Sequence, residues 1–356
     1  MLLLGMAVWG IVTPDREYSE QEKRNLMQRE EILKDTGKWG KKLGKNIESY
    51  LTDQFPKRDQ FVTIRTMADI SLGKREVNNV FIGKDYYLID TFSSYDKKIW
   101  KRNLRKLKHF EKRLSKEKIS SQVILVPAAV EILNKKLPAY ACHCSQKKLI
   151  QEAKQEVPEV IDITNVLRKH ASEQIYYRSD HHWTSEGAYY AYVQWKQTAG
   201  QKAAPLSGWK KETLCSNFKG TTWAKTSLPG KEYEDRITGY YHNKNRKVSY
   251  NGGNYVSSSI YEKKYLKGKD QYGVFFNSNQ VLTTIPGGGK SGKLLLVKDS
   301  YANTFAQFVI DDYKEIQMID MRFFRGDLAS YVTSNHFDDV LVLYGCSGFA
   351  TEEKRF

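Results

Sequence analysis

Residues 177–187 have the sequence Tyr-Arg-Ser-Asp-His-His-Trp-Thr-Ser-Glu-Gly, which places Asp180 two residues before His182. A carboxylate at that spacing can reach back to the imidazole ring if the chain turns, whereas the ring of the adjacent His181 projects the other way. The carboxylate fixes one tautomer of the imidazole and makes its far nitrogen a better proton acceptor, as a hydroxyl nucleophile requires. We therefore predict that His182 is a general base and that Asp180 orients it.

The nucleophile that fits this pair is Ser300. It follows the apolar run 294–297 and precedes a helical segment that begins near Tyr301. A serine at the carboxyl end of a strand and the amino end of a helix lies beside free backbone N–H groups, which can stabilise an oxyanion. The alternative is a plain helix cap, a role that serine often has. The presence of Asp180 and His182 in the same chain favours catalysis.

Apolar segments of strand length alternate with segments of helical periodicity over most of the chain. Strands are expected at 122–126, 160–163, 293–298, 315–320 and 340–344, and helices at 100–114, 146–156, 185–198, 301–312 and 328–335. This alternation predicts an α/β fold with a mostly parallel sheet covered by helices on both faces. Functional sites in such sheets lie at the carboxyl ends of the strands.

The regions outside this pattern suggest a division of the chain. Residues 1–12 are apolar but too short to cross the ~30 Å hydrocarbon core as they stand. We interpret them as the remnant of a signal anchor, with a buried core strand as the alternative. Residues 13–75 are a charged, helical lead-in, and residues 76–356 are the catalytic domain. Within that domain we expect a β-hairpin at 77–90 and, at 203–292, an insertion of hairpins and loops over the site.

Composition sets few further limits. The 356 residues are 40% hydrophobic, enough for a core without disulfides, and the net charge of +16 favours anionic partners or reflects a Lys-rich host. The Cys142–Cys144 pair is too close for an ordinary disulfide, and Cys215 and Cys346 stand alone. A His-His pair can bind metal, but nothing else completes a recognisable ligand set. We therefore predict neither a metal nor a cofactor, and no nucleic-acid partner, because the basic residues are dispersed.

An acyl-transfer site also needs oxyanion donors besides the Ser300 N–H. Asn279, Gly220 and Thr221 are polar positions beside apolar residues and are candidates for this role or for substrate contact. Each of them is also explained by an ordinary turn.

Asp180-His181-His182-Trp183 is the motif that names the DHHW family, and the chain resembles that family on further segments. Residues 298–303, with the sequence Lys-Asp-Ser-Tyr-Ala-Asn, are similar to its serine block and to the Gly-Asp-Ser motif of SGNH hydrolases. Residues 81–85 and 319–324 also resemble it. The chain departs from these relatives at Lys298, where SGNH proteins have Gly, and at 277–279, which is Asn-Ser-Asn instead of Gly-Gly-Asn.

DHHW proteins are similar to the SGNH-like O-acetyltransferases of alginate and other exopolysaccharides. The resemblance implies a three-layer α/β/α sandwich and a triad of Ser300, His182 and Asp180. It also implies an enzyme on the extracytoplasmic face of a bacterial cell membrane, beside a membrane-bound O-acyltransferase that supplies acetyl groups. The expected reaction moves an acetyl group through an acyl-enzyme at Ser300 onto a hydroxyl of a cell-surface or secreted polysaccharide.

Two other functions remain open on the sequence. An acetyl-polysaccharide esterase would use the same three residues, and a catalytically silent polysaccharide-binding scaffold would use only the basic surface.

Overall fold

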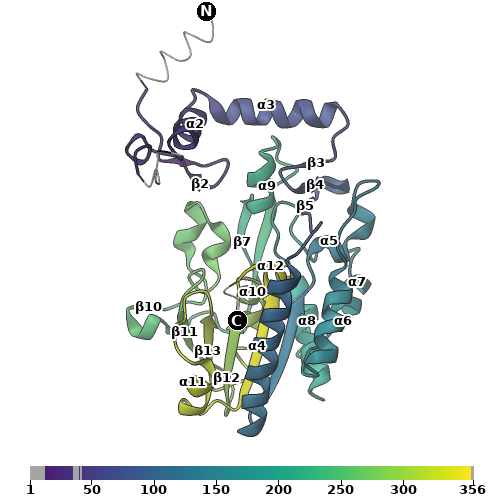
Figure 1. The fold of residues 1–356 in the computed structure, drawn as a ribbon. Coiled ribbons are helices and arrows are strands. Elements are labelled where there is room, and N and C mark those ends of the chain that lie inside the picture. The colour runs from purple at the N-terminus through teal and green to yellow at the C-terminus, as the bar shows by residue number, and fades with distance from the viewer. Residues whose placement is uncertain (1–12, 35–39, 41, 354–356) are drawn as a thin grey trace, which may run out of the picture.

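The computed structural model describes residues 13–34, 40 and 42–353, and these form a mixed α/β fold (Figure 1). The predicted anchor remnant at residues 1–12 lies outside the described residues. Among the described residues, none of the helices combines the length and the apolar character needed to cross a membrane.

The central feature is a large sheet. In spatial order its strands are β10 (Tyr255–Ser257), β9 (Val248–Tyr250), β11 (Leu282–Pro286), β13 (Glu315–Asp320), β12 (Lys293–Lys298), β14 (Asp339–Gly345) and β6 (Ser120–Val126). Strands β13, β12, β14 and β6 are parallel, β9 runs in the same direction, and β11 and β10 run the opposite way. The prediction of a mostly parallel sheet is therefore confirmed. The residues of β12 from Leu294 to Lys298 are all buried, as expected for a strand covered on both faces.

Helices of the sheet domain pack in two groups. One group contains α4 (Lys97–Lys116), α6 (Gln146–Glu156), α11 (Leu328–Ser334) and α12 (Cys346–Thr351), and the other contains α8 (Ser185–Thr198) and α10 (Tyr301–Val309). Helix α4 starts where the Asp96 carboxylate accepts the N–H groups of Lys98 and Ile99. It then buries Trp100, Leu107 and Leu114 at helical spacing. All of these helices except α12 occur where the sequence predicts them.

The predicted strand at 160–163 is wrong. Val160 makes a single parallel bridge to Val123 of β6, and the chain then turns into α7 (Thr164–Lys169). The physical reason is Asp162, whose side chain accepts the N–H of Thr164 and starts the helix.

The predicted insertion at 203–292 is partly built into the large sheet. Strands β9, β10 and β11 extend the sheet beyond β13, and β11 alternates buried and less buried residues as a half-buried strand does. The rest forms the hairpin of β7 (Lys210–Phe218) and β8 (Asp235–Tyr241), which are joined through α9 (Thr221–Thr226).

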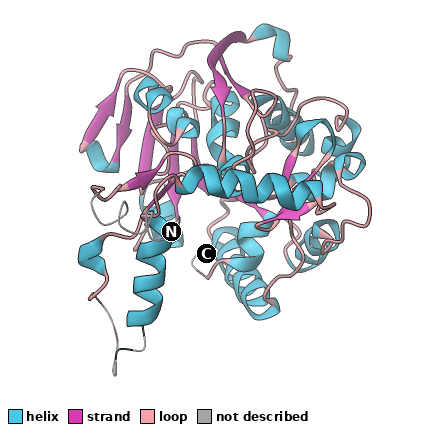
Figure 2. Ribbon diagram, turned by 90° about the horizontal axis from the view of Figure 1, so that it is seen from above, coloured by secondary structure: helices cyan, strands magenta, loops and turns pink. Residues whose placement is uncertain are grey.

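The segment that precedes the sheet is only partly helical. It contains the short pair β1 (Tyr18–Ser19) and β2 (Arg24–Asn25), then α2 (Leu43–Asp53) and α3 (Arg58–Ser71), which lie across one end of the molecule (Figure 1) and in front when viewed from above (Figure 2). Thr63 of α3 donates its hydroxyl to the carbonyl of Ser227, just after α9. The hairpin predicted at 77–90 is a three-stranded sheet of β3 (Glu76–Val77), β4 (Val80–Ile82) and β5 (Leu88–Asp90).

Candidate active site

Ser300 lies between the end of β12 and the start of α10, at the carboxyl ends of the parallel strands. The preceding residue, Asp299, fixes this turn. Its buried carboxylate accepts the N–H of Tyr301 at 2.9 Å and the N–H of Gly345, at the end of β14, at 2.9 Å. The serine is therefore held against two neighbouring strands rather than on a free loop.

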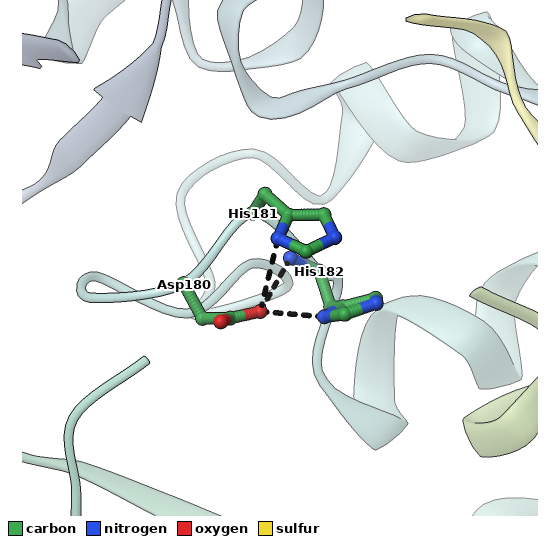
Figure 3. Close-up of side chains that lie close together, drawn as sticks. All are labelled: Asp180, His181 and His182. Atoms are coloured by element: carbon green, nitrogen blue, oxygen red, sulfur yellow. Dashed lines mark hydrogen bonds and ion pairs between the residues drawn. The ribbon is translucent and has the colours of Figure 1, made fainter. Parts of the chain in front are cut away.

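His182 and Asp180 complete a hydrogen-bonded row with Ser300. The Nε2 atom of His182 lies 2.7 Å from the Ser300 hydroxyl oxygen, and its Nδ1 atom lies 2.5 Å from Asp180 Oδ1. Figure 3 shows the Asp180 carboxylate turned back toward His182, and the same oxygen accepts the His182 backbone N–H at 3.0 Å. The structure thus brings the three predicted residues together in the order Ser300, His182 and Asp180, which is the order that the predicted roles require.

Asp180 stays ionised in this environment. Its burial would raise the pKa of the carboxyl, but the nearby His181 and His182 and the hydrogen bonds from His182 and Thr221 hold that pKa well below its ordinary value. If His182 accepts a proton, the ionised and buried Asp180 carboxylate stabilises the imidazolium that forms.

Gly220 and Thr221 contact the Asp180 side chain, and their polar groups are not turned toward Ser300. The Thr221 backbone N–H and hydroxyl donate to Asp180 Oδ2 at 2.7 and 3.0 Å. Gly220 approaches so closely that a Cβ there would lie 2.2 Å from that same oxygen. The Thr221 N–H and hydroxyl are used on Asp180, and the Gly220 N–H donates to the Ser179 hydroxyl at 3.3 Å. We therefore correct the predicted oxyanion role of both residues to the positioning of Asp180.

His181 occupies the outer side of the pair. Its Nδ1 atom lies 2.7 Å from the Thr221 hydroxyl, and 34% of its side chain is exposed. Partial removal from water and the adjacent His182 lower the pKa of His181 to about 4, so that this ring is neutral near pH 7.

Asn279 is the remaining predicted oxyanion donor, and a buried lysine fixes it. Lys298 Nζ donates to Asn279 Oδ1 at 3.0 Å and to Asn303 Oδ1 at 2.8 Å. With its carbonyl oxygen occupied in this way, Asn279 has its amide N–H₂ group for other contacts. This arrangement gives a structural role to Lys298, the position at which the sequence departs from the Gly-Asp-Ser motif that it resembles.

Two aromatic residues pack beside this row of side chains. The Tyr272 ring stacks on His182 with 3.9 Å between centroids and 8° between planes, and its hydroxyl donates to the Ser300 carbonyl at 3.1 Å. Trp183 is fully buried, and its indole N–H donates to the Tyr301 carbonyl at 2.9 Å. The sequence gives no signal for Tyr272, which comes from a segment without periodicity.

The same cluster could in principle ligate a metal, since one ligand atom each from Asp180, His181 and His182 lies within 4.8 Å of the others. In the observed arrangement, however, both nitrogens of His182 are used by Asp180 and Ser300, and Nδ1 of His181 is used by Thr221. The donor set fits proton transfer better than ligation.

Comparison with known proteins agrees with this geometry. The sequence model described as DHHW protein matches residues 92–319. No curated protein matches the chain by sequence. Among solved structures, a DHHW family protein from Eubacterium siraeum DSM 15702 has a TM-score of 0.68 at 24% identity, over 78% of this chain and 94% of that chain.

Two further structures share the fold at lower identity. Bacillus cereus PatB1 has a TM-score of 0.64 at 16% identity, over 78% of this chain and 99% of that one, and is also known with a sulfonyl adduct. The O-acetyltransferase domain of Pseudomonas putida AlgJ has a TM-score of 0.50 at 12% identity, over 77% and 93% of the two chains. The fold is therefore one that an O-acetyltransferase also uses.

Proposed function

The chain belongs to the DHHW family, and on that premise we propose that it transfers acetyl groups through Ser300 onto hydroxyls of a cell-surface or secreted polysaccharide. The observation that carries the proposal is the 2.7 Å contact between the Ser300 hydroxyl and His182 Nε2. A serine that serves only as a helix cap would bond the backbone of its own helix, whereas Ser300 makes no side-chain cap bond to α10.

In the first step the Ser300 oxygen attacks the carbonyl carbon of an acetyl donor while His182 Nε2 accepts the hydroxyl proton. The tetrahedral intermediate collapses, the bond from the carbonyl carbon to the leaving oxygen breaks, and His182 returns its proton to that oxygen. The products are an acetyl-Ser300 ester and the free donor alcohol. Asp180 remains ionised and stabilises the imidazolium that forms in between.

In the second step a sugar hydroxyl takes the place of the donor. His182 removes its proton, the sugar oxygen attacks the acetyl carbon, and the ester bond to Ser300 breaks as His182 protonates the serine oxygen. Water in the same position would give free acetate instead, which is the esterase reaction.

Two donors are proposed for the oxyanion in both steps. One is the Ser300 N–H, at the amino end of α10, and the other is the N–H₂ group of Asn279, which Lys298 orients through the opposite side of the amide. Lys298 would then contribute both positioning and a nearby positive charge.

We further propose that the enzyme works on the extracytoplasmic face of the cell membrane, held by an N-terminal anchor and supplied by a membrane-bound O-acyltransferase. The apolar sequence of residues 2–12 supports the anchor. The two helix groups described above would be the outer layers of the three-layer sandwich implied by the family resemblance.

A labelling and transfer experiment tests the function. The sulfonyl adduct known for PatB1 suggests a sulfonyl fluoride as the probe, with mapping of the modified residue by mass spectrometry. Ser300 should be labelled in the wild type and not in His182→Ala, and Ser257→Ala should label normally. The protein is then given p-nitrophenyl acetate with neutral, N-acetylated or uronate oligosaccharides.

The outcome separates the three candidate functions. Acetylated oligosaccharide that depends on Ser300 supports the transferase. Free acetate alone, whichever acceptor is present, would assign the esterase, and an unreactive Ser300 would leave a binding scaffold.

A further inference from the structure

Helix α3 turns a largely polar face toward the rest of the protein and an apolar face toward solvent, the opposite of a typical surface helix. Besides Ile70, which packs against Val80 and Leu88, its inner face carries polar side chains, such as the buried Thr66 and the Thr63 that bonds Ser227. Its outer face carries Phe61 and Ile64, which are 47% and 61% exposed, and the C-cap residue Leu72, which is 83% exposed, continues the same stripe. A helix that packs on a protein core buries its apolar stripe, so this stripe is built to meet something apolar outside the chain.

Helix α2 shows the same reversal. Asn46 and Asp53 turn inward, where Asn46 bonds the carbonyl of Ile32 and Asp53 accepts the guanidinium of Arg24. The outer face carries Ile47 and Leu51, which are 41% and 61% exposed.

The outer faces of the two helices meet in one groove. It has a volume of about 660 Å³ and is lined mainly by apolar side chains of both helices, among them Ile47, Leu51, Phe55, Phe61 and Val62. Across the described residues, thirteen large hydrophobic side chains are exposed, and seven of them lie between Leu33 and Leu72. Exposed apolar surface is therefore concentrated on this one element, as at interaction sites.

Cations surround the apolar surface. Lys42, Lys45, Arg65 and Arg75 are exposed on or beside α2 and α3. Of the acids there, Glu48 is exposed at the groove, Asp69 pairs with Lys74, and Asp53 is buried, so exposed cations outnumber exposed anions around the groove. Apolar side chains flanked by lysine and arginine are typical of helices that lie in the interfacial layer of an anionic membrane. The preceding chain points to the same occupant, since residues 2–12 are apolar and end where this part of the fold begins.

We propose that the outer face of α2 and α3, which we call the lead-in face, inserts into the surface of an anionic lipid bilayer. This is a second membrane contact, separate from an anchor at residues 1–12. It would fix the orientation of the domain relative to the membrane, which a single flexible anchor would not do.

The orientation brings the candidate site toward the membrane. The segment that bears the lead-in face also touches the loop that holds Asp180: Lys23 donates to the carbonyl of Lys219, which directly precedes Gly220 and Thr221. This consequence rests on the proposed function, in which acetyl groups arrive from the membrane, whereas the lipid contact itself does not.

The test uses the full chain with Cys142 and Cys144 replaced by serine and one new cysteine carrying an environment-sensitive fluorophore. Ile64→Cys and Leu72→Cys report on the lead-in face, and Tyr140→Cys, at a position 99% exposed in the catalytic domain, is the control. With vesicles of phosphatidylcholine and phosphatidylglycerol, labels at 64 and 72 should shift to the blue and be quenched by brominated lipid. The label at 140 should not change.

A paired variant keeps the test independent of residues 1–12. Ile64→Asp with Leu72→Asp should weaken vesicle binding about tenfold or more, because it places charge in the apolar layer. Val256→Asp with Val281→Asp, at exposed positions near the edge of the large sheet, should leave binding unchanged.

Other occupants give other results, and each would overturn the proposal. Labels at 64 and 72 that stay in water while the protein sediments with vesicles would exclude the lipid contact. Labels that become buried without vesicles as protein concentration rises would assign the face to a second copy. Vesicle binding that requires an embedded acyltransferase would assign it to a protein partner. No acetyl donor is present, so Ser300→Ala must behave as wild type whether or not the proposed function holds.

Discussion

Gly220 lies against the Asp180 side chain with no room between them. A Cβ atom at residue 220 would come within 2.2 Å of the Asp180 Cβ and Oδ2 atoms, nearer than real Cβ contacts allow. The φ of Gly220 is −93°, so its backbone does not require glycine, and the close approach to Asp180 is the reason for this residue.

Gly220→Ala should therefore move Asp180 away from His182. Because loss of the orienting acid removes the preferred tautomer of the base, we expect kcat to fall about a hundredfold or more. Acetyl transfer to an oligosaccharide and thermal unfolding are measured together. Gly208→Ala is the control, since no atom lies within 4 Å of the added methyl group. Wild-type kcat in Gly220→Ala would show that Asp180 does not orient the base.

Trp183 links the motif to the helix that follows the nucleophile. Trp183→Phe removes the indole N–H that donates to the Tyr301 carbonyl, and leaves a buried acceptor with one partner fewer. We expect a loss of about 2–3 kcal/mol in the free energy of unfolding, measured by denaturant titration.

Trp100 provides the matched comparison. It is also almost fully buried, but its indole N–H has no hydrogen-bond partner among the described residues. Trp100→Phe should therefore cost about 1 kcal/mol less than Trp183→Phe, the difference being the hydrogen bond. Equal losses would mean that Trp183 contributes only its volume.

Tyr272 should affect the base through its ring more than through its hydroxyl. Tyr272→Phe keeps the ring that stacks on His182 and loses the hydrogen bonds of the hydroxyl to the Ser300 carbonyl and the Thr304 hydroxyl, so we expect kcat to fall about fivefold. Tyr272→Ala removes both and should lower kcat at least tenfold further, since the imidazole is then free to tilt. Similar kcat values for the two variants would assign the effect to the hydroxyl.

The sequence predicts the parts of the site that depend on local pattern. The apolar run that becomes β12 is followed by Ser300 at the junction with a helix, and the spacing of Asp180 and His182 is enough to suggest their bond. Such short-range signals determine both strand ends and side-chain direction. The family motif adds the identity of the fold.

The rest depends on contacts between distant segments. Thr221 reaches Asp180 across 41 positions and Tyr272 reaches Ser300 across 28, from a region without a helical or strand period. Gly220 and Thr221 were plausible oxyanion donors as isolated turn residues, and only their packing shows what their N–H groups bind. The strand expected at 160–163 is wrong for a similar reason, because the Asp162 side chain bonds the N–H of Thr164, where a helix begins.

His181 should make the folded chain sensitive to acid. Its pKa is about 4 in the folded chain and ordinarily 6.5, so between these values the unfolded chain binds a proton that the folded chain excludes. Stability is therefore full above pH 6.5 and is lost as the pH falls toward 4. Asp180 acts in the same direction, but only below its ordinary pKa of 3.8.

His181→Gln should reduce this dependence. We expect the wild type to lose about 1 kcal/mol more than the variant between about pH 7 and about pH 5, a value that allows for the partial exposure of the ring. Denaturant titrations at both values measure it, with His336→Gln as the control. If the free energy of unfolding had the same pH dependence in wild type and His181→Gln, protonation of the His181 ring would not destabilise the folded chain.

Lys23 connects the lead-in to the site and gives the last prediction. Burial lowers the pKa of its amine while Asp180 opposes that change, and the amine donates to the carbonyl of Lys219, next to the Gly220–Thr221 turn. Lys23→Met keeps most of the volume and removes this donor. Because the turn that contacts Asp180 is then less constrained, kcat should fall about fivefold with KM unchanged.

Lys269→Met is the control. The Lys269 amine lies over the Tyr18 ring, so it also joins the lead-in to the domain, but it does not contact the turn beside Asp180. If both variants lowered activity equally, the lead-in would act as a cover over the site, and not through Asp180.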